Sequence, residues 1–160
     1  MNINYANINY ANIITITGMI IVVYSLFTYY HTHNIIYIGT ALLGFTCDYL
    51  DGYVARKLNH TSDFGNTLDK LVDKINQLGI HILLMAMYDV SPVYIIIFFI
   101  REIIMFIARK NNMKASTSSF YGKLKTALYP ILLVLYHFNI KFKEEYLQLL
   151  TIFNMMTLLL

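Results

Sequence analysis

The chain has 160 residues, of which 58% are hydrophobic and only 13% are charged, and its mean hydropathy is +0.54. Soluble domains usually have about a quarter of their residues charged, so this composition argues against an ordinary water-soluble protein. The abundance of Ile, Leu, Phe and Tyr also excludes intrinsic disorder. A single cysteine excludes an intrachain disulfide and a cysteine-based zinc cluster. The 12 basic residues are expected at membrane surfaces, so no nucleic acid partner is predicted.

Apolar runs predict six helices that cross the lipid bilayer in one bundle. In chain order, these helices are expected at residues 13–30, 35–56, 66–88, 92–109, 120–138 and 146–160. The expected fold class is therefore an all-α, multi-pass integral membrane protein with a single domain over residues 1–160. His81, inside the third run, is expected to be a hydrogen-bonded group in the core or at an interface.

Basic residues predict the orientation of this bundle. With the N-terminus inside, the inner loops contain Arg56, Lys57, Arg109, Lys110 and Lys114. Among the outer connections, only Lys141 and Lys143 are basic. Both termini are therefore expected on the cytoplasmic side. The first 47 residues carry no Lys, Arg, Asp or Glu, so no cleavable signal peptide is expected.

Four of the nine acidic residues, Asp48, Asp51, Asp69 and Asp73, form two close pairs within one short stretch of the chain. The first two are three residues apart and the last two are four apart, so each pair shares a helical face. Four like charges near hydrocarbon must take up protons or bind a cation, and carboxylate oxygens suit Mg²⁺ or Mn²⁺. The alternatives are a solvated loop and ion pairs with neighbouring basic residues, namely Arg56, Lys70 and Lys74. Helical spacing of the surrounding apolar residues argues against a loop.

These aspartates belong to a longer pattern, Asp48-x2-Asp51-Gly52-x2-Ala55-Arg56, then eight residues, then Gly65-x3-Asp69-x3-Asp73. The pattern resembles the signature of the CDP-alcohol phosphotransferases, and every fixed position is present. Six membrane helices, with the signature joining the second and third, are the architecture of that family. The resemblance therefore implies an active site at the cytoplasmic ends of helices two and three, and a homodimer.

The resemblance also implies the chemistry. Family members displace CMP from a CDP-linked lipid, usually CDP-diacylglycerol, with the hydroxyl of an alcohol. It implies that a pair of Mg²⁺ or Mn²⁺ ions is held by Asp48, Asp51, Asp69 and Asp73. Asp73 is then the expected base that takes the proton from the attacking hydroxyl. The residues implied in binding the CDP group are Asp48, Gly52, Ala55, Arg56 and Gly65, together with Asn12 and Thr15 near the N-terminus.

Two later segments bear on the acceptor alcohol. Ile100-Arg101-Glu102-Ile103-Ile104, followed by Arg109, and Gly122-Lys123-Leu124-Lys125-Thr126 resemble segments of the phosphatidylglycerophosphate synthases of this family. Cations suit a small phosphorylated acceptor such as glycerol 3-phosphate. The residues expected to bind its phosphate are Arg101, Arg109, Lys123 and Lys125. The expected reaction gives phosphatidylglycerophosphate and CMP, although these cations could instead only mark the inner membrane boundary.

Departures from the family pattern leave other acceptors open. For example, Lys70 stands where a proline commonly follows the third signature aspartate. The alternatives are a cardiolipin synthase that uses phosphatidylglycerol, and transferases for inositol phosphate, serine, choline or ethanolamine. A small cation transporter is an alternative from another class, but clustering of the carboxylates near one end of two helices argues against it. A third possibility is an inactive family member that acts as an assembly partner.

Overall fold

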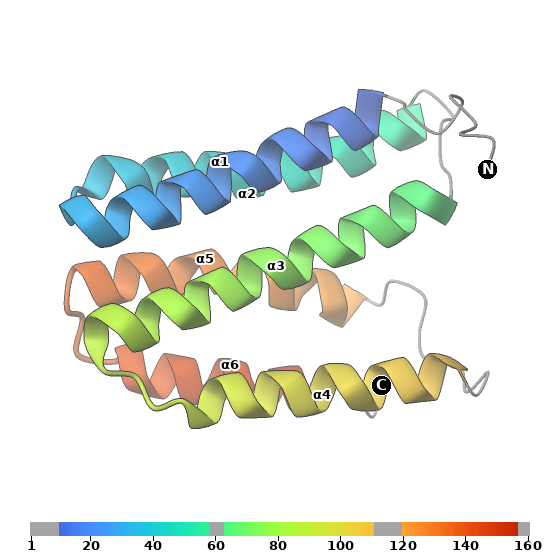
Figure 1. The fold of residues 1–160 in the computed structure, drawn as a ribbon. Coiled ribbons are helices and arrows are strands. Elements are labelled where there is room, and N and C mark those ends of the chain that lie inside the picture. The colour runs from blue at the N-terminus through green and yellow to red at the C-terminus, as the bar shows by residue number, and fades with distance from the viewer. Residues whose placement is uncertain (1–9, 58–62, 111–119, 157–160) are drawn as a thin grey trace. The chain divides into compact units, whose positions relative to one another are not determined.

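The computed structural model of the chain describes residues 10–57, 63–110 and 120–156, and within these ranges every regular element is an α-helix (Figure 1). The helices are α1 (Tyr10–Thr32), α2 (Ile35–Lys57), α3 (Asp63–Tyr88), α4 (Val93–Lys110), α5 (Phe120–His137) and α6 (Lys143–Met156). The predicted all-α class and the six predicted helices are confirmed, and each expected helix end lies within a few residues of the observed one.

The helices fall into two compact units, residues 1–79 and residues 80–160. The first unit contains α1, α2 and the first part of α3, and the second contains the rest of α3 with α4, α5 and α6. The single domain expected over residues 1–160 stays a prediction.

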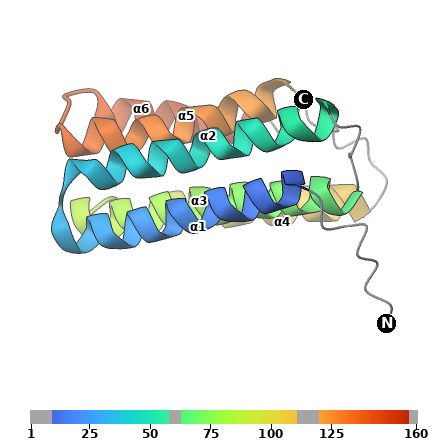
Figure 2. The same cartoon turned by 90° about the horizontal axis from the view of Figure 1, so that it is seen from above.

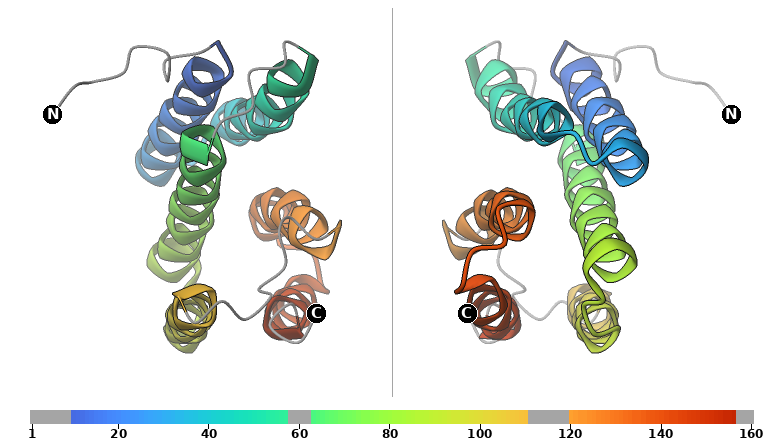
Figure 3. Two further views of the ribbon diagram at one scale, coloured as in Figure 1. Left: turned by 90° about the vertical axis from the view of Figure 1, so that its right-hand side faces the viewer. Right: turned by 90° about the vertical axis from the view of Figure 1, so that its left-hand side faces the viewer.

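In the first unit, α1 and α2 form an antiparallel hairpin and lie side by side (Figures 1 and 3). The turn between them is closed by local hydrogen bonds. His33 has a left-handed backbone, with φ of 54°, and its N–H donates to the Tyr29 carbonyl at 2.8 Å. The Asn34 side chain then accepts a hydrogen bond from the Ile36 N–H at 3.0 Å and caps α2. These caps end one helix and start the next within two residues.

Gly44 allows a close approach of α1 and α2. A Cβ atom at this position would lie 2.6 Å from Val22 Cγ2 and 2.9 Å from the Gly18 carbonyl oxygen. Both distances are shorter than real Cβ contacts, so any side chain here would push the helices apart. Gly44 therefore fixes the separation of the hairpin, as small residues do where helices pack closely.

In the second unit, α5 and α6 form another neighbouring pair (Figure 2). Asn139, with φ of 50°, lies in the turn after α5, and the Ile140 N–H donates to the Leu135 carbonyl at 2.9 Å. The Tyr146 hydroxyl of α6 donates to the Leu128 carbonyl of α5 at 3.0 Å. The buried apolar side chains of this pair are Tyr129, Leu132, Leu133, Tyr136, Leu147 and Leu150.

One helix among the described residues, Ala11–Thr32, is long and apolar enough to cross a membrane. A shorter apolar stretch covers Ala127–His137. The helices α2, α3 and α4 each carry several charged residues within their lengths, which lowers their overall apolar character. The six predicted helices are therefore present, whereas the crossing of a membrane by all six stays a prediction.

Candidate active site

Of the two signature aspartates on α2, Asp51 is the one whose side chain the structure describes. Its side chain is 4% exposed, and so is that of Thr15 on α1. The Thr15 hydroxyl donates a hydrogen bond to Asp51 Oδ2. The same oxygen, Thr15 Oγ1, lies 3.0 Å from the Ala11 carbonyl oxygen one turn earlier. Asp48 precedes Asp51 by one turn of α2, and its side chain lies outside the described ones.

The other two signature aspartates, Asp69 and Asp73, lie half-buried on α3. Asn76 follows Asp73 by about one turn and is only 2% exposed. Because these residues are spaced by four and three positions, they share one face of the helix. In the described part of the chain, no hydrogen-bond partner is found for Asn76 Oδ1. Gln77, next along α3, is also buried, so the polar face continues from the carboxylates into the interior.

The donor chemistry of the signature fits a hard divalent cation, because carboxylate oxygens are the ligands that Mg²⁺ and Mn²⁺ prefer. Among the residues that the structure describes, no three His, Cys, Asp or Glu side chains are grouped so that they could hold one ion. The side chain of Asp48 is not among these described residues. Convergence of the four carboxylates on a metal therefore stays a prediction.

The residues implied in binding CDP lie on all three helices of the first unit. Asn12 and Thr15 share one face of α1, and both side chains are buried, which makes this a polar interior surface. Gly52 on α2 and Gly65 on α3 are half-buried. The side chains of Ala55 and Arg56 are outside the described ones. A role in nucleotide binding stays a prediction for the whole set, namely Asn12, Thr15, Asp48, Gly52, Ala55, Arg56 and Gly65.

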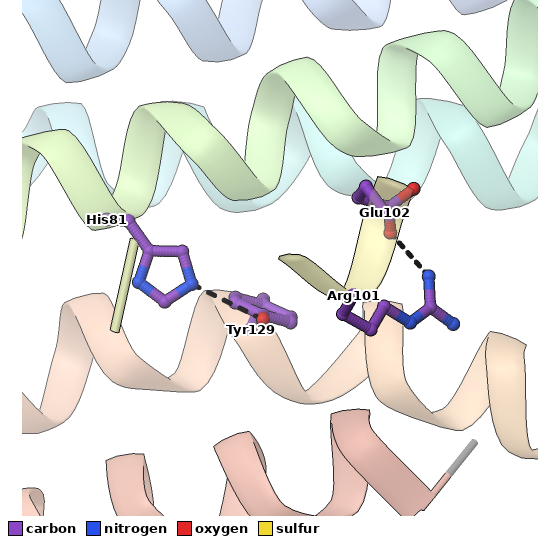
Figure 4. Close-up of polar contacts among 4 residues, drawn as sticks. All are labelled: His81, Arg101, Glu102 and Tyr129. Atoms are coloured by element: carbon purple, nitrogen blue, oxygen red, sulfur yellow. Dashed lines mark hydrogen bonds and ion pairs between the residues drawn. The ribbon is translucent and has the colours of Figure 1, made fainter. Parts of the chain in front are cut away.

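Arg101 is the described member of the predicted acceptor-binding set. It lies on α4 in the second unit, and its side chain, 7% exposed, forms an ion pair with Glu102, 12% exposed (Figure 4). Nη1 of the guanidinium donates to Glu102 Oε1. A buried charge needs such a partner, because removing it from water is costly. The expected roles of the other three cations, Arg109 on α4 and Lys123 and Lys125 on α5, concern side chains outside the described ones.

His81 and Tyr129 form a second buried polar contact in this unit. His81 Nε2 lies 3.4 Å from the Tyr129 hydroxyl, and the two rings meet edge to face with centroids 5.5 Å apart (Figure 4). The centroid of the Phe98 ring lies 5.7 Å from that of the His81 ring. His81 was expected to be a hydrogen-bonded core or interface group, and this contact and its burial place it in the core.

Asn76, Gln77 and Tyr129 are buried polar residues that were not among the predicted site residues. The signal for the first two was present, because they continue the spacing of Asp69 and Asp73 along one face of α3. Tyr129 carried no comparable signal, since it is one of 14 tyrosines in an apolar chain.

Proteins similar to this chain include three that are named CDP-diacylglycerol–glycerol-3-phosphate 3-phosphatidyltransferase. The protein from Wigglesworthia glossinidia brevipalpis is 34% identical over 115 residues, which is 66% of this chain and 60% of that protein. The one from Mycoplasma pneumoniae is 32% identical over 103 residues, or 61% of this chain and 45% of its own length. The one from Bacillus subtilis is 36% identical over 56 residues, covering 35% of this chain and 28% of that protein.

Another similar protein, from Arabidopsis thaliana, is named CDP-diacylglycerol–inositol 3-phosphatidyltransferase 1. It is 37% identical over 51 residues, which is 32% of this chain and 22% of that protein. The aligned stretches thus span less than two thirds of each of these relatives. The family described as CDP-alcohol phosphatidyltransferase, in contrast, matches residues 8–160, which is nearly the whole chain. The chain therefore belongs to the CDP-alcohol phosphatidyltransferase family.

Proposed function

We propose that this protein transfers a phosphatidyl group from CDP-diacylglycerol to the hydroxyl of glycerol 3-phosphate, giving phosphatidylglycerophosphate and CMP. The observation that carries the proposal is the complete eight-position signature, in a chain that matches the family over residues 8–160. Glycerol 3-phosphate as the acceptor is supported by the names of the relatives aligned over 115 and 103 residues.

The enzyme is proposed to be a multi-pass protein of the lipid bilayer, with its active site facing the cytoplasm. Large exposed apolar side chains support this placement, because water-soluble proteins rarely expose wide apolar patches. On α1 they include Ile16, Ile20, Val23 and Phe27, and on α4 they include Phe99, Ile103, Phe106 and Ile107. Exposed apolar side chains are favourable where they contact the hydrocarbon chains of lipids. A homodimer, implied by the family resemblance, belongs to the same proposal.

In the proposed reaction, the acceptor hydroxyl oxygen attacks the phosphorus atom that carries the diacylglycerol. The bond from that phosphorus to the CMP phosphate breaks, and CMP leaves with the electron pair. Asp73 takes the proton of the hydroxyl, which makes the oxygen a better nucleophile as the new bond forms. Half-burial of Asp73 suits this role, since the carboxylate is partly shielded from water while it is still reachable by substrate.

The carboxylates of Asp48, Asp51, Asp69 and Asp73 would hold the divalent ions. When bound, these ions neutralise the charge of the diphosphate and of the leaving CMP. The burial of Asp51 and its hydrogen bond with Thr15 give one such ligand a fixed orientation. The residues proposed to hold the nucleotide also lie on α1, α2 and α3.

Arg101, Arg109, Lys123 and Lys125 are proposed to bind the phosphate of the acceptor. An arginine presents five N–H donors in a planar fork, a geometry that matches a phosphate group. The Arg101–Glu102 ion pair supports a defined orientation for this guanidinium.

Transfer to inositol is the second candidate, favoured by the similarity to the Arabidopsis protein. Inositol lacks a phosphate group, so an inositol acceptor would not need the four basic side chains that are proposed to bind a phosphate. The two acceptors therefore make different demands on the same residues.

The test is CMP release by the purified protein in detergent, with CDP-diacylglycerol and Mg²⁺ or Mn²⁺. The acceptors to compare are glycerol 3-phosphate, inositol, inositol 1-phosphate, serine and phosphatidylglycerol, with a control that lacks any acceptor. We expect the fastest release with glycerol 3-phosphate and none after Asp73→Asn. Faster release with another acceptor would reassign the substrate, and full activity of Asp73→Asn would remove that residue as the base. Light scattering of the same preparation measures the oligomeric state.

A further inference from the structure

We infer that Thr15 is a positioning residue that orients the Asp51 carboxylate, so that α1 shapes the signature site without contributing a ligand at this position. The inference rests on the proposed function, in which Asp51 acts at the site of phosphatidyl transfer. It assigns Thr15 a role that differs from the direct nucleotide contact expected from the sequence.

The contact itself is a hydrogen bond from a neutral hydroxyl to a carboxylate. Thr15 donates to Asp51 Oδ2, and both side chains are 96% buried. Hydrogen bonds to charged acceptors are stronger than neutral ones, and a low dielectric strengthens them further. A bond to one named oxygen also restricts rotation of the carboxylate about its Cβ–Cγ bond. Thr15 therefore contributes to the orientation of the Asp51 carboxylate from α1.

The position of Thr15 is determined by the packing of the hairpin. Two contacts show the antiparallel register: Gly44 packs against Val22, and Ser25 Oγ shares a 2.8 Å hydrogen bond with Thr40 Oγ1. As residue numbers rise along α1, the numbers of the facing residues on α2 fall, and Thr15 with Asp51 follows the same order. The donor is therefore held by contacts that do not involve Asp51. A supporting group that is itself held by packing is what precise orientation of a ligand requires.

Thr15 also has a second acceptor within reach. Its oxygen lies 3.0 Å from the Ala11 carbonyl, the usual backbone acceptor for a threonine in a helix. A hydroxyl has one hydrogen, so it can donate fully to only one of the two oxygens at a time. If a substrate or cation binds Asp51 Oδ2 in its place, the Thr15 hydroxyl can donate its hydrogen bond to the Ala11 carbonyl oxygen instead. Thr15 therefore does not become an unsatisfied buried donor during a catalytic cycle.

The first experiment measures the contact without any metal or substrate. The melting temperature of the full-length protein in detergent and EDTA is compared for wild type, Thr15→Val, Asp51→Ala and the double variant. Valine keeps the shape of threonine and removes the hydroxyl. We expect Thr15→Val to lower the melting temperature in the wild type and to have little effect in the Asp51→Ala background. Equal shifts in both backgrounds would overturn the inference, because the two residues would then act independently.

The second experiment separates positioning from simple stabilisation. We expect Thr15→Val to lower kcat roughly ten- to a hundredfold, the scale of one hydrogen bond to a charged group. The Mg²⁺ concentration that gives half the maximal rate should rise, while KM for glycerol 3-phosphate stays the same. Thr15→Ser, which keeps the hydroxyl, should restore both kcat and the Mg²⁺ requirement.

Ser25→Ala is the matched control, because it removes another hydroxyl contact between the same two helices. It should lower the melting temperature but leave the Mg²⁺ requirement unchanged. If Ser25→Ala and Thr15→Val change the Mg²⁺ requirement equally, Thr15 acts only through hairpin stability and the inference is wrong. A wild type with no transferase activity would instead contradict the proposed function, while the thermal cycle in EDTA would still report on the Thr15–Asp51 contact.

Discussion

The Tyr129 hydroxyl and His81 Nε2 lie 3.4 Å apart in the interior of the second unit, and they join α5 to the later part of α3. Both side chains are buried, so each ring contributes apolar packing as well as a polar atom. His81 thus has two kinds of neighbour, the Tyr129 hydroxyl and the Phe98 ring. This arrangement makes it a structural histidine, unlike the residues of the signature.

Replacing Tyr129 with phenylalanine tests this contact. The ring and its edge-to-face packing on His81 remain, but the imidazole nitrogen loses its partner. We expect a stability loss of about 1 kcal/mol, as for a buried hydrogen bond of ordinary strength. Thermal unfolding in detergent measures it. The control is the same substitution in a His81→Phe background. There, Tyr129→Phe should lower stability much less than it does in the wild type.

The Arg101–Glu102 ion pair makes a different prediction, because both side chains are charged and nearly buried. Arg101→Leu leaves the Glu102 charge without that partner, and we expect a loss of about 3–5 kcal/mol. The double variant Arg101→Leu/Glu102→Leu removes both charges, and its melting temperature should recover toward that of the wild type. If Arg101 also binds the acceptor phosphate, the double variant will be stable yet show a raised KM for glycerol 3-phosphate. A double variant as unstable as Arg101→Leu would show that lost packing dominates.

Gly44 and Gly39 on α2 provide a matched pair for testing the close approach of the hairpin. Ala at position 44 would clash with the Gly18 carbonyl, whereas a Cβ at Gly39 meets nothing within 4 Å. We expect Gly44→Ala to cost about 1–3 kcal/mol, the usual range for overpacking. Gly39→Ala should raise the melting temperature slightly, because alanine favours the helix by up to about 1 kcal/mol relative to glycine. Similar melting temperatures for the two variants would contradict a tight crossing at Gly44.

The six helices could be predicted because each contains an apolar stretch whose polar residues follow helical spacing. The helix ends were less predictable. His33, Asp89 and Asn139 each adopt a left-handed backbone in a turn, with φ between 50° and 54°, and none is the glycine that usually marks such a position. His, Asp and Asn adopt this conformation more often than other non-glycine residues, but they are a weaker signal than glycine, so the local sequence did not fix the exact helix ends.

The candidate site shows the same division. The Asp69–Asp73 face was predictable, since it follows from spacing within one helix. The Thr15–Asp51 hydrogen bond was not, because its partners are 36 residues apart and meet only through the register that Gly44 permits. Spacing within a helix can be read from the sequence, but the facing of two helices depends on side-chain packing along their whole contact.

Asn76 should be a residue at which stability and activity oppose each other. It is 2% exposed on the face of α3 that carries Asp69 and Asp73, and within the described ranges its Oδ1 has no hydrogen-bond partner. A buried unsatisfied acceptor costs about 1–3 kcal/mol, so Asn76→Leu should raise the melting temperature. The same change puts an apolar side chain beside the proposed base, and CMP release should fall.

Asn66→Leu is the control for this comparison, because Asn66 is an exposed asparagine of the same helix. Its melting temperature should stay close to that of the wild type, as for most surface substitutions. A lower melting temperature for Asn76→Leu would mean that the amide oxygen has a partner, whereas unchanged CMP release would place Asn76 away from the reacting groups. A gain in stability together with a loss of turnover is expected, because a polar group kept in the interior at a cost to folding is typical of a substrate-binding surface.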